Sequence, residues 1–188
     1  EEGKYMVYFS IGKKSQNHYM IYYSYANEDF TDLTQPKVLY DHGANTIDGD
    51  IVFANGEYHL FFKTEGQGNG IQKATSKSLK GPWVAGYKYL QQTTLSVEGS
   101  GVFRKINSND WILMYDCYMN GFYQFCSSSD LENFSFICNT STSGSFTPRH
   151  GTAITITAEE AKRLLAKWPA SGLSNLPLGA RNLNIRQA

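Results

Sequence analysis

The sequence predicts an all-β fold built from repeated small sheets, arranged as the blades of a propeller. Three observations support this. Strand-like runs dominate the chain, an aromatic motif returns at a fixed interval, and acidic or imidazole side chains return at nearly the same interval. A helical pattern is found in a single segment near the C-terminal end.

The expected strands are short runs rich in Tyr, Phe, Val and Ile. Clusters of Gly, Asn, Asp and Ser separate them, as is typical of strands joined by turns. The runs expected to form strands are 5–9, 19–25, 51–53, 58–62, 71–75, 102–104, 111–115, 122–126 and 153–156.

The aromatic runs 5–9, 58–62 and 111–115 start at intervals of 53 and 53 residues. Each is followed by a turn and a second strand. A period of about 40 to 55 residues with four short strands in each repeat is typical of propeller blades. A β-sandwich with coincidental spacing is the alternative.

The segment 157–168 predicts a C-terminal helix. Thr157 and Glu160 have the spacing of a capping box, an apolar stripe follows, and Pro169 would end the helix. We therefore expect a propeller domain over residues 1–168. Residues 169–188 form a tail without usable periodicity.

Composition restricts the partners. The 188 residues include 17 Lys and Arg against 17 Asp and Glu, so no net field favours nucleic acid or an anionic membrane. No apolar run approaches the roughly 20 residues of a membrane span. The three cysteines are odd in number and lack CxxC spacing, which indicates neither a disulfide scaffold nor a zinc site. The composition is compatible with neutral ligands such as sugars.

Asp48, Glu98 and His150 occupy equivalent places in their repeats, 50 and 52 residues apart. Each lies just before a short apolar run. In a propeller such positions converge on the central axis, so we expect two carboxylates and an imidazole to face a common pocket. The glycines that follow the acids, Gly49 and Gly99, would leave room for a sugar to approach the backbone.

Two such carboxylates could cleave a glycosidic bond. One protonated carboxyl donates a proton to the leaving oxygen, and a carboxylate opposite it activates water. A neighbouring negative charge would raise the pKa of Glu98 and keep it protonated near neutral pH. The alternatives are an ordinary exposed glutamate at Glu98, a turn-capping role for Asp48 or Asp50, and a structural role for His150.

At these residues the sequence resembles glycoside hydrolase family 43, over residues 1 to about 168. The matching pieces are Ile47-Asp48 before 51–53, Glu98-Gly99 before 102–103, and 149–151. The resemblance implies a five-bladed propeller with Glu98 as general acid and Asp48 as the aspartate that modulates its pKa. It places His150 near a calcium ion on the axis. It also implies a carbohydrate substrate, with inverting cleavage of α-L-arabinofuranosyl or β-D-xylosyl linkages, in a secreted or periplasmic protein.

The sequence departs from the family pattern at Gly49 and Ser100, where proline is usual. The general-base aspartate of the first blade also has no counterpart in the sequence. We therefore expect a part of the propeller, about three and a half blades from blade two to blade five, that is inactive alone. The competing functions are a non-catalytic carbohydrate-binding propeller and a retaining, fructan-type hydrolase.

Overall fold

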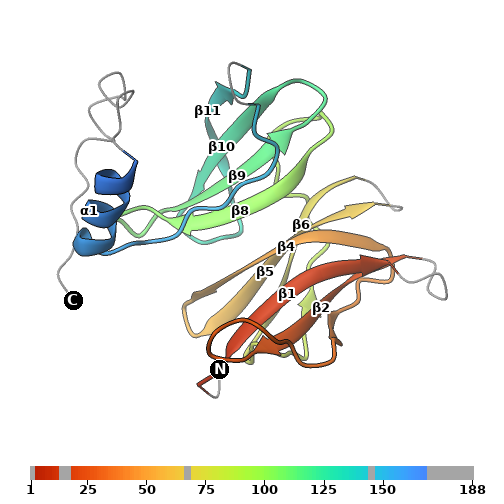
Figure 1. Cartoon of the computed structure of the whole chain (residues 1–188). Helices are drawn as coiled ribbons and strands as arrows, with labels where there is room; N and C mark the ends of the chain where they lie inside the picture. The colour runs from red at the N-terminus through yellow and green to blue at the C-terminus, as the bar shows by residue number, and fades with distance from the viewer. Residues whose placement is uncertain (1–2, 13–17, 66–68, 144–146, 169–188) are drawn as a thin grey trace. The chain divides into compact units, whose positions relative to one another are not determined.

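The computed structural model describes residues 3–12, 18–65, 69–143 and 147–168 (Figure 1). These residues form three antiparallel sheets and one helix. The chain divides into two compact units, residues 1–152 and 153–188. The sheets belong to the first unit and the helix to the second.

The three sheets follow one another along the chain, as expected for blades. The first contains β1 (Tyr5–Gly12), β2 (Tyr19–Ala26) and β3 (Lys37–Tyr40), in that order. The second has the order β4 (Asn45–Ala54), β5 (Glu57–Glu65), β6 (Asn69–Ser76) and β7 (Val84–Ala85). The third has the order β8 (Glu98–Arg104), β9 (Trp111–Cys117), β10 (Phe122–Ser128) and β11 (Ser135–Ser141).

The aromatic repeats lie in β1, β5 and β9. In the two four-stranded sheets this is the second strand, whereas β1 is the first strand of its sheet. The first sheet therefore corresponds to the outer three strands of a blade, in agreement with the sequence analysis. The fold is confirmed as a set of propeller blades.

The strand expected at residues 153–156 does not form, so the described residues give three sheets and no part of a fourth. A strand needs a hydrogen-bonding neighbour, and no described strand pairs with this segment. Its apolar residues alone therefore did not predict its conformation.

The hydrophobic core lies on both faces of the middle sheet. Phe61 belongs to a cluster shared with the third sheet, which includes Val102 and Leu113. Leu60 and Phe62 belong to a second cluster shared with the first sheet. Because successive side chains of a strand point to opposite faces, β5 is buried almost continuously. The middle sheet is thus packed between its two neighbours.

The second unit contains α1 (Ala158–Lys167), which confirms the expected helix. The Thr157 hydroxyl accepts from the Glu160 amide, and the Glu160 carboxylate accepts from the Thr157 amide at 2.7 Å. The tail at 169–188 lies outside the described residues.

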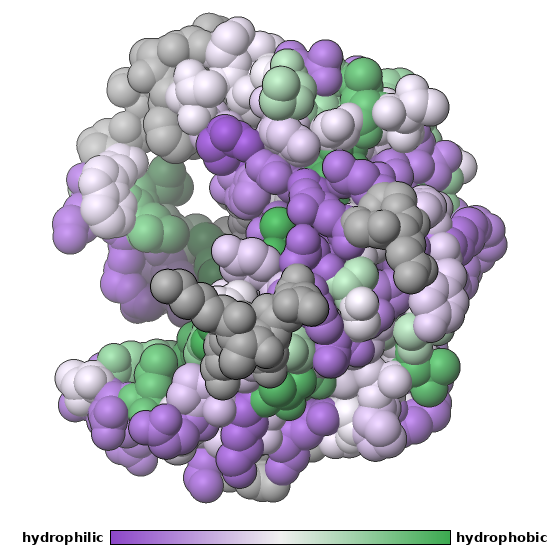
Figure 2. Space-filling model, turned by 90° about the vertical axis from the view of Figure 1, so that its right-hand side faces the viewer, coloured by the Kyte–Doolittle hydropathy of each residue, from purple (hydrophilic) through white to green (hydrophobic). Residues whose placement is uncertain are grey.

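No described helix is long and apolar enough to cross a bilayer. The face shown in Figure 2 is largely hydrophilic, and its hydrophobic residues form small separate groups.

Candidate active site

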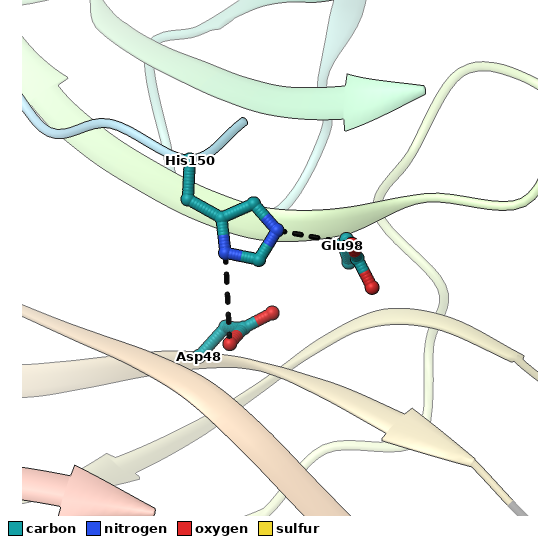
Figure 3. Close-up of side chains that lie close together, drawn as sticks. All are labelled: Asp48, Glu98 and His150. Carbon is teal, nitrogen blue, oxygen red and sulfur yellow. Dashed lines mark hydrogen bonds and ion pairs between the residues drawn. The ribbon is translucent and has the colours of Figure 1, made fainter. Parts of the chain in front are cut away.

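The structure brings the three predicted site residues together. Asp48, Glu98 and His150 each place one polar atom within 4.8 Å of the others (Figure 3). His150 Nε2 lies 3.1 Å from Glu98 Oε1, and His150 Nδ1 lies 3.9 Å from Asp48 Oδ1. Asp48 comes from β4, Glu98 is the first residue of β8, and His150 lies within residues 147–152, which have no regular secondary structure.

A β-bulge positions each carboxylate. The pairing of β4 with β5 shifts between Ile47 and Asp50, and the pairing of β8 with β9 shifts between Glu98 and Gly101. Asp48 has φ +54°, in the left-handed region that non-glycine residues seldom adopt. A bulge bends a strand and redirects its side chains. Equivalent bulges in two sheets thus turn both carboxylates toward one point.

Hydrogen bonds tie the two bulges to each other. Asp48 Oδ2 accepts from the Gly99 amide at 2.9 Å, and Asp50 Oδ2 accepts from the Val102 amide at 2.6 Å. Burial raises the pKa of Asp50, although hydrogen bonds from Val102, Ile51 and Tyr8 oppose that rise. Asp50 therefore links two sheets, whereas Asp48 is the aspartate that faces Glu98 and His150.

The expectation that Gly49 and Gly99 leave room for a sugar is wrong. A Cβ at Gly49 would lie 2.7 Å from Ile21 Cδ1, and a Cβ at Gly99 would lie 2.6 Å from the His150 ring. Both positions are filled by neighbouring side chains. Glycine is needed there for close packing, and at Gly99 also for its φ of +63°.

Glu98 lies among cationic groups. Its side chain is 16% exposed, Oε1 accepts from Arg149 Nη2 at 2.6 Å, and Oε2 accepts from Lys63 Nζ at 3.3 Å. Burial raises the pKa of Glu98, but the hydrogen bonds and charges of His150 and Lys63 outweigh burial, so the pKa is lowered. The rise in the pKa of Glu98 expected from the sequence is therefore not found. Glu98 has Asp48 as a neighbour, but it also contacts the cations of Lys63 and Arg149.

Four residues of this cluster were assigned no role from the sequence, namely Lys63, Asp116, Tyr118 and Arg149. Lys63 is almost fully buried and also pairs with Glu65 at 2.9 Å. Arg149 Nε donates to buried Asp116 at 3.0 Å, so one guanidinium joins Asp116 and Glu98. The cations of Lys63 and Arg149 lie 5.0 and 5.7 Å from the ring centre of Tyr118.

A sequence signal for two of them existed. Lys63 and Asp116 each directly follow the aromatic motif of their repeat, and they are 53 residues apart, the period of that motif. The aromatic strands lie next to the strands that bear the site carboxylates. A polar residue ending such a strand therefore reaches the same site.

The spacing of the three groups is compatible with a metal ion, but their chemistry does not fit calcium. Calcium prefers six to eight oxygen ligands, and here an imidazole takes one of three positions. Both oxygens of Glu98 already accept from cationic side chains. These three groups do not fit calcium, and His150 is a partner of the two carboxylates.

The separation of the carboxylates limits their roles. Glu98 and Asp48 have oxygens within 4.8 Å of each other. An inverting glycosidase holds its acid and base about 6.5 to 9.5 Å apart to admit a water molecule. Asp48 is too close to Glu98 to act as that base, so this geometry suits a residue that influences the ionisation of Glu98.

Comparison with known proteins identifies the domain. A family model related to glycoside hydrolase family 43, described as "Probable glycosyl hydrolase domain", matches residues 1–162. A search of curated proteins gave no match.

Several solved structures share the fold. A candidate glycoside hydrolase from Parabacteroides distasonis is 14% identical with a TM-score of 0.58, and the match covers 79% of this chain and 51% of that one. The fructofuranosidase of Schwanniomyces occidentalis is 15% identical with a TM-score of 0.55, covering 73% of this chain and 31% of that one. The α-L-arabinofuranosidase of Podospora anserina is 11% identical with a TM-score of 0.55, covering 78% of this chain and 48% of that one.

The chain therefore spans about half or less of the length of these structures, and at such identities the likeness concerns the fold alone. The family assignment rests on the family model, which covers most of the chain. The chain belongs to the glycosyl hydrolase domains related to glycoside hydrolase family 43.

Proposed function

We propose that this domain takes part in the inverting hydrolysis of α-L-arabinofuranosyl or β-D-xylosyl linkages in plant polysaccharides or oligosaccharides, with Glu98 as general acid. One observation carries the proposal. Two carboxylates 50 residues apart, each placed by a bulge at the inner edge of a separate sheet, lie within 4.8 Å of each other. The choice of sugar rests on the family resemblance.

In this mechanism Glu98 donates its proton to the glycosidic oxygen as the bond to the anomeric carbon breaks. Water, deprotonated by a general base, attacks from the opposite face of the sugar. Asp48 opposes ionisation of Glu98 through its negative charge. Asp48 is too close to Glu98 to serve as that base, so a different carboxylate has to supply it.

The lowered pKa of Glu98 has to be reversed before it can act as an acid. Arg149 is the cation best placed to move, because its side chain is 57% exposed whereas that of Lys63 is 2% exposed. A sugar that displaces the Arg149 guanidinium from Glu98 Oε1 removes a nearby positive charge and excludes water from the site. Both changes raise the pKa of Glu98. Substrate binding would thus prepare the acid.

A second candidate function is supported by the same cations. A carboxylate held by Lys63, Arg149 and His150 is a fixed hydrogen-bond acceptor, which suits recognition of sugar hydroxyls. This arrangement favours a non-catalytic carbohydrate-binding domain.

The test uses the 188-residue chain with 4-nitrophenyl α-L-arabinofuranoside and β-D-xyloside, with and without azide. Azide can attack the anomeric carbon in place of activated water, giving a glycosyl azide and 4-nitrophenol. Release of 4-nitrophenol that azide accelerates, together with azide-dependent cleavage of an arabino- or xylo-oligosaccharide that Glu98→Gln lowers, supports the enzyme. Saturable binding of the sugar without release supports the binding domain. If the chain neither releases 4-nitrophenol nor binds the sugar, both proposed functions are overturned.

A further inference from the structure

A cavity that does not include Glu98 lies in the first unit. It has a volume of about 410 Å³, within the range of small-ligand sites. The connection between β3 and β4, strands β5 and β6, and the segment after β7 provide its lining. The lining residues are His42, Gly43, Ala44, Thr64, Gln72, Tyr87 and Tyr89.

Aromatic rings form part of this lining. The His42 ring lies 5.5 Å from that of Tyr87 and 5.0 Å from that of Phe62, between centroids. Tyr87 is 73% exposed, so much of its ring is open to solvent. The apolar C–H face of a sugar packs on such a ring.

A buried amide also belongs to the lining. Gln72 is 4% exposed, and its amide nitrogen donates to the Tyr87 carbonyl at 3.1 Å. Its Oε1 is buried beside the His42 ring, and a hydrogen-bond interaction with Gln72 raises the pKa of that ring. The Gln72 amide thus holds both the Tyr87 backbone and the His42 ring, so the aromatic lining is in place before a ligand binds.

The cavity suits an uncharged ligand. The residues that line it include no lysine, arginine or carboxylate. Burial lowers the pKa of His42, more than Gln72 and Asp41 raise it, so the imidazole is neutral at neutral pH. His42 Nδ1 is held by the Tyr40 hydroxyl at 2.8 Å.

The middle sheet separates this cavity from the candidate active site. Lys63 and Thr64 are neighbours in β5, and successive side chains point to opposite faces of a strand. Lys63 reaches Glu98, whereas Thr64 lines the cavity. The two sites therefore lie on opposite faces of the same strand.

We propose that this cavity is a second carbohydrate-binding site, which holds one neutral sugar residue of an oligosaccharide or polysaccharide on the Tyr87 ring, beside His42 and Thr64. This role goes beyond the proposed function and does not require catalysis at Glu98. It would add affinity for a polymer without contacting the bond that is cleaved.

Two substitutions at Tyr87 test the proposal in the full chain. Tyr87→Ala removes the platform and should weaken retention in gels containing arabinan or xylan about fivefold, the effect of losing one stacked ring. Tyr87→Trp keeps an aromatic platform, so this variant should still be retained by the polymer. Its added indole should also show a saturable emission change with neutral arabino- or xylo-oligosaccharides that the parent protein lacks.

Phe136→Ala is the matched control, because Phe136 is an exposed aromatic residue on the outer strand β11. The proposal is overturned if Tyr87→Ala migrates like Phe136→Ala while the emission of the introduced indole does not respond to sugar. Stronger retention of the parent protein by polygalacturonate than by arabinan would contradict the proposal that the ligand is uncharged. Tyr87→Ala should leave hydrolysis of small aryl glycosides unchanged. Adding Glu98→Gln to the Tyr87→Trp variant should leave the indole signal unchanged, so the two sites can fail separately.

Discussion

Arg149 and Glu98 form an ion pair in which Nη2 lies 2.6 Å from Oε1. The same guanidinium holds Asp116, the residue paired with Glu98 in the register of β8 and β9. The segment that carries His150 is therefore anchored to the third sheet by charge. This anchoring fixes the imidazole over both site carboxylates.

With azide in place of activated water, replacing Glu98 with Gln should lower turnover of glycosides with poor leaving groups by about 10² to 10⁴, because a general acid contributes about that much. Binding should change little, since the amide keeps the shape of the side chain. Steady-state hydrolysis and calorimetric binding of the same oligosaccharide check this. Glu65→Gln is the control, because Glu65 contacts Lys63 without contacting Glu98. Hydrolysis by Glu98→Gln at the parent rate would remove Glu98 from the mechanism.

Replacing Lys63 with Met should raise the pKa of Glu98. Lys63 lowers that pKa by its charge and its hydrogen bond, and Met fills the volume without either. Titration of the glutamate carboxyl carbons by NMR measures the change. Lys77→Met provides a control, because Lys77 is exposed and pairs with Glu57. An unchanged Glu98 pKa in Lys63→Met would contradict the assigned cause.

The same lowered pKa has a consequence for stability. A carboxyl whose folded pKa is below its unfolded value stabilises the fold above about pH 4.3 and loses that contribution as the pH falls through the folded pKa. Glu98→Gln should therefore lose less unfolding free energy than the parent on acidification across this window. Urea unfolding at a series of pH values checks the slope, and equal slopes would show that Glu98 does not contribute.

Asp48 and Asp50 should respond differently to substitution. Asp48→Asn should reduce turnover with little change in the free energy of unfolding, because Asn keeps the bulge conformation and can still accept from Gly99. Asp50→Ala should lower the free energy of unfolding by about 1 to 3 kcal/mol, because it leaves the Val102 amide unpaired between two sheets. Denaturant unfolding beside activity separates the two, and the reverse pattern would reassign the roles.

Gly99→Ala and Gly56→Ala form a matched pair. Both glycines have positive φ, +63° and +78°, so alanine costs about 1 to 2 kcal/mol at each. An added Cβ meets nothing within 4 Å at Gly56, but lies 2.6 Å from His150 at Gly99. Gly99→Ala should therefore be the more destabilising and should shift the His150 ring resonances. Equal losses by denaturation would show that the contact with His150 is relaxed without cost.

Periodicity was enough to predict the blades and the meeting of Asp48, Glu98 and His150, because both depend on positions that repeat. The outer strands β3, β7 and β11 were not predicted. All seven residues of β11 are exposed, so no apolar face marks it, and β7 has only two residues. Such strands form because a neighbour offers hydrogen bonds, which the local sequence does not encode.

The electrostatics of Glu98 could not be predicted from spacing among acids alone. Lys63 lies in the aromatic strand, and it reaches Glu98 only because two sheets pack face to face. The bulges were also hidden. Residue 48 is an aspartate and not a glycine, so its residue type does not indicate the left-handed backbone that turns its side chain toward Glu98. These features arise from contacts between repeats and not from the repeat itself.

The register of β5 determines two sites, because one face of the strand contributes Lys63 to the candidate active site and the other contributes Thr64 to the cavity. Deleting one residue of β5 before Lys63 would turn every later side chain of the strand toward the opposite neighbouring sheet. The ammonium group would then enter an aromatic, uncharged cavity, and Glu98 would lose its buried counter-ion. Both sites would be lost through one backbone slip, although neither would have lost a residue of its own.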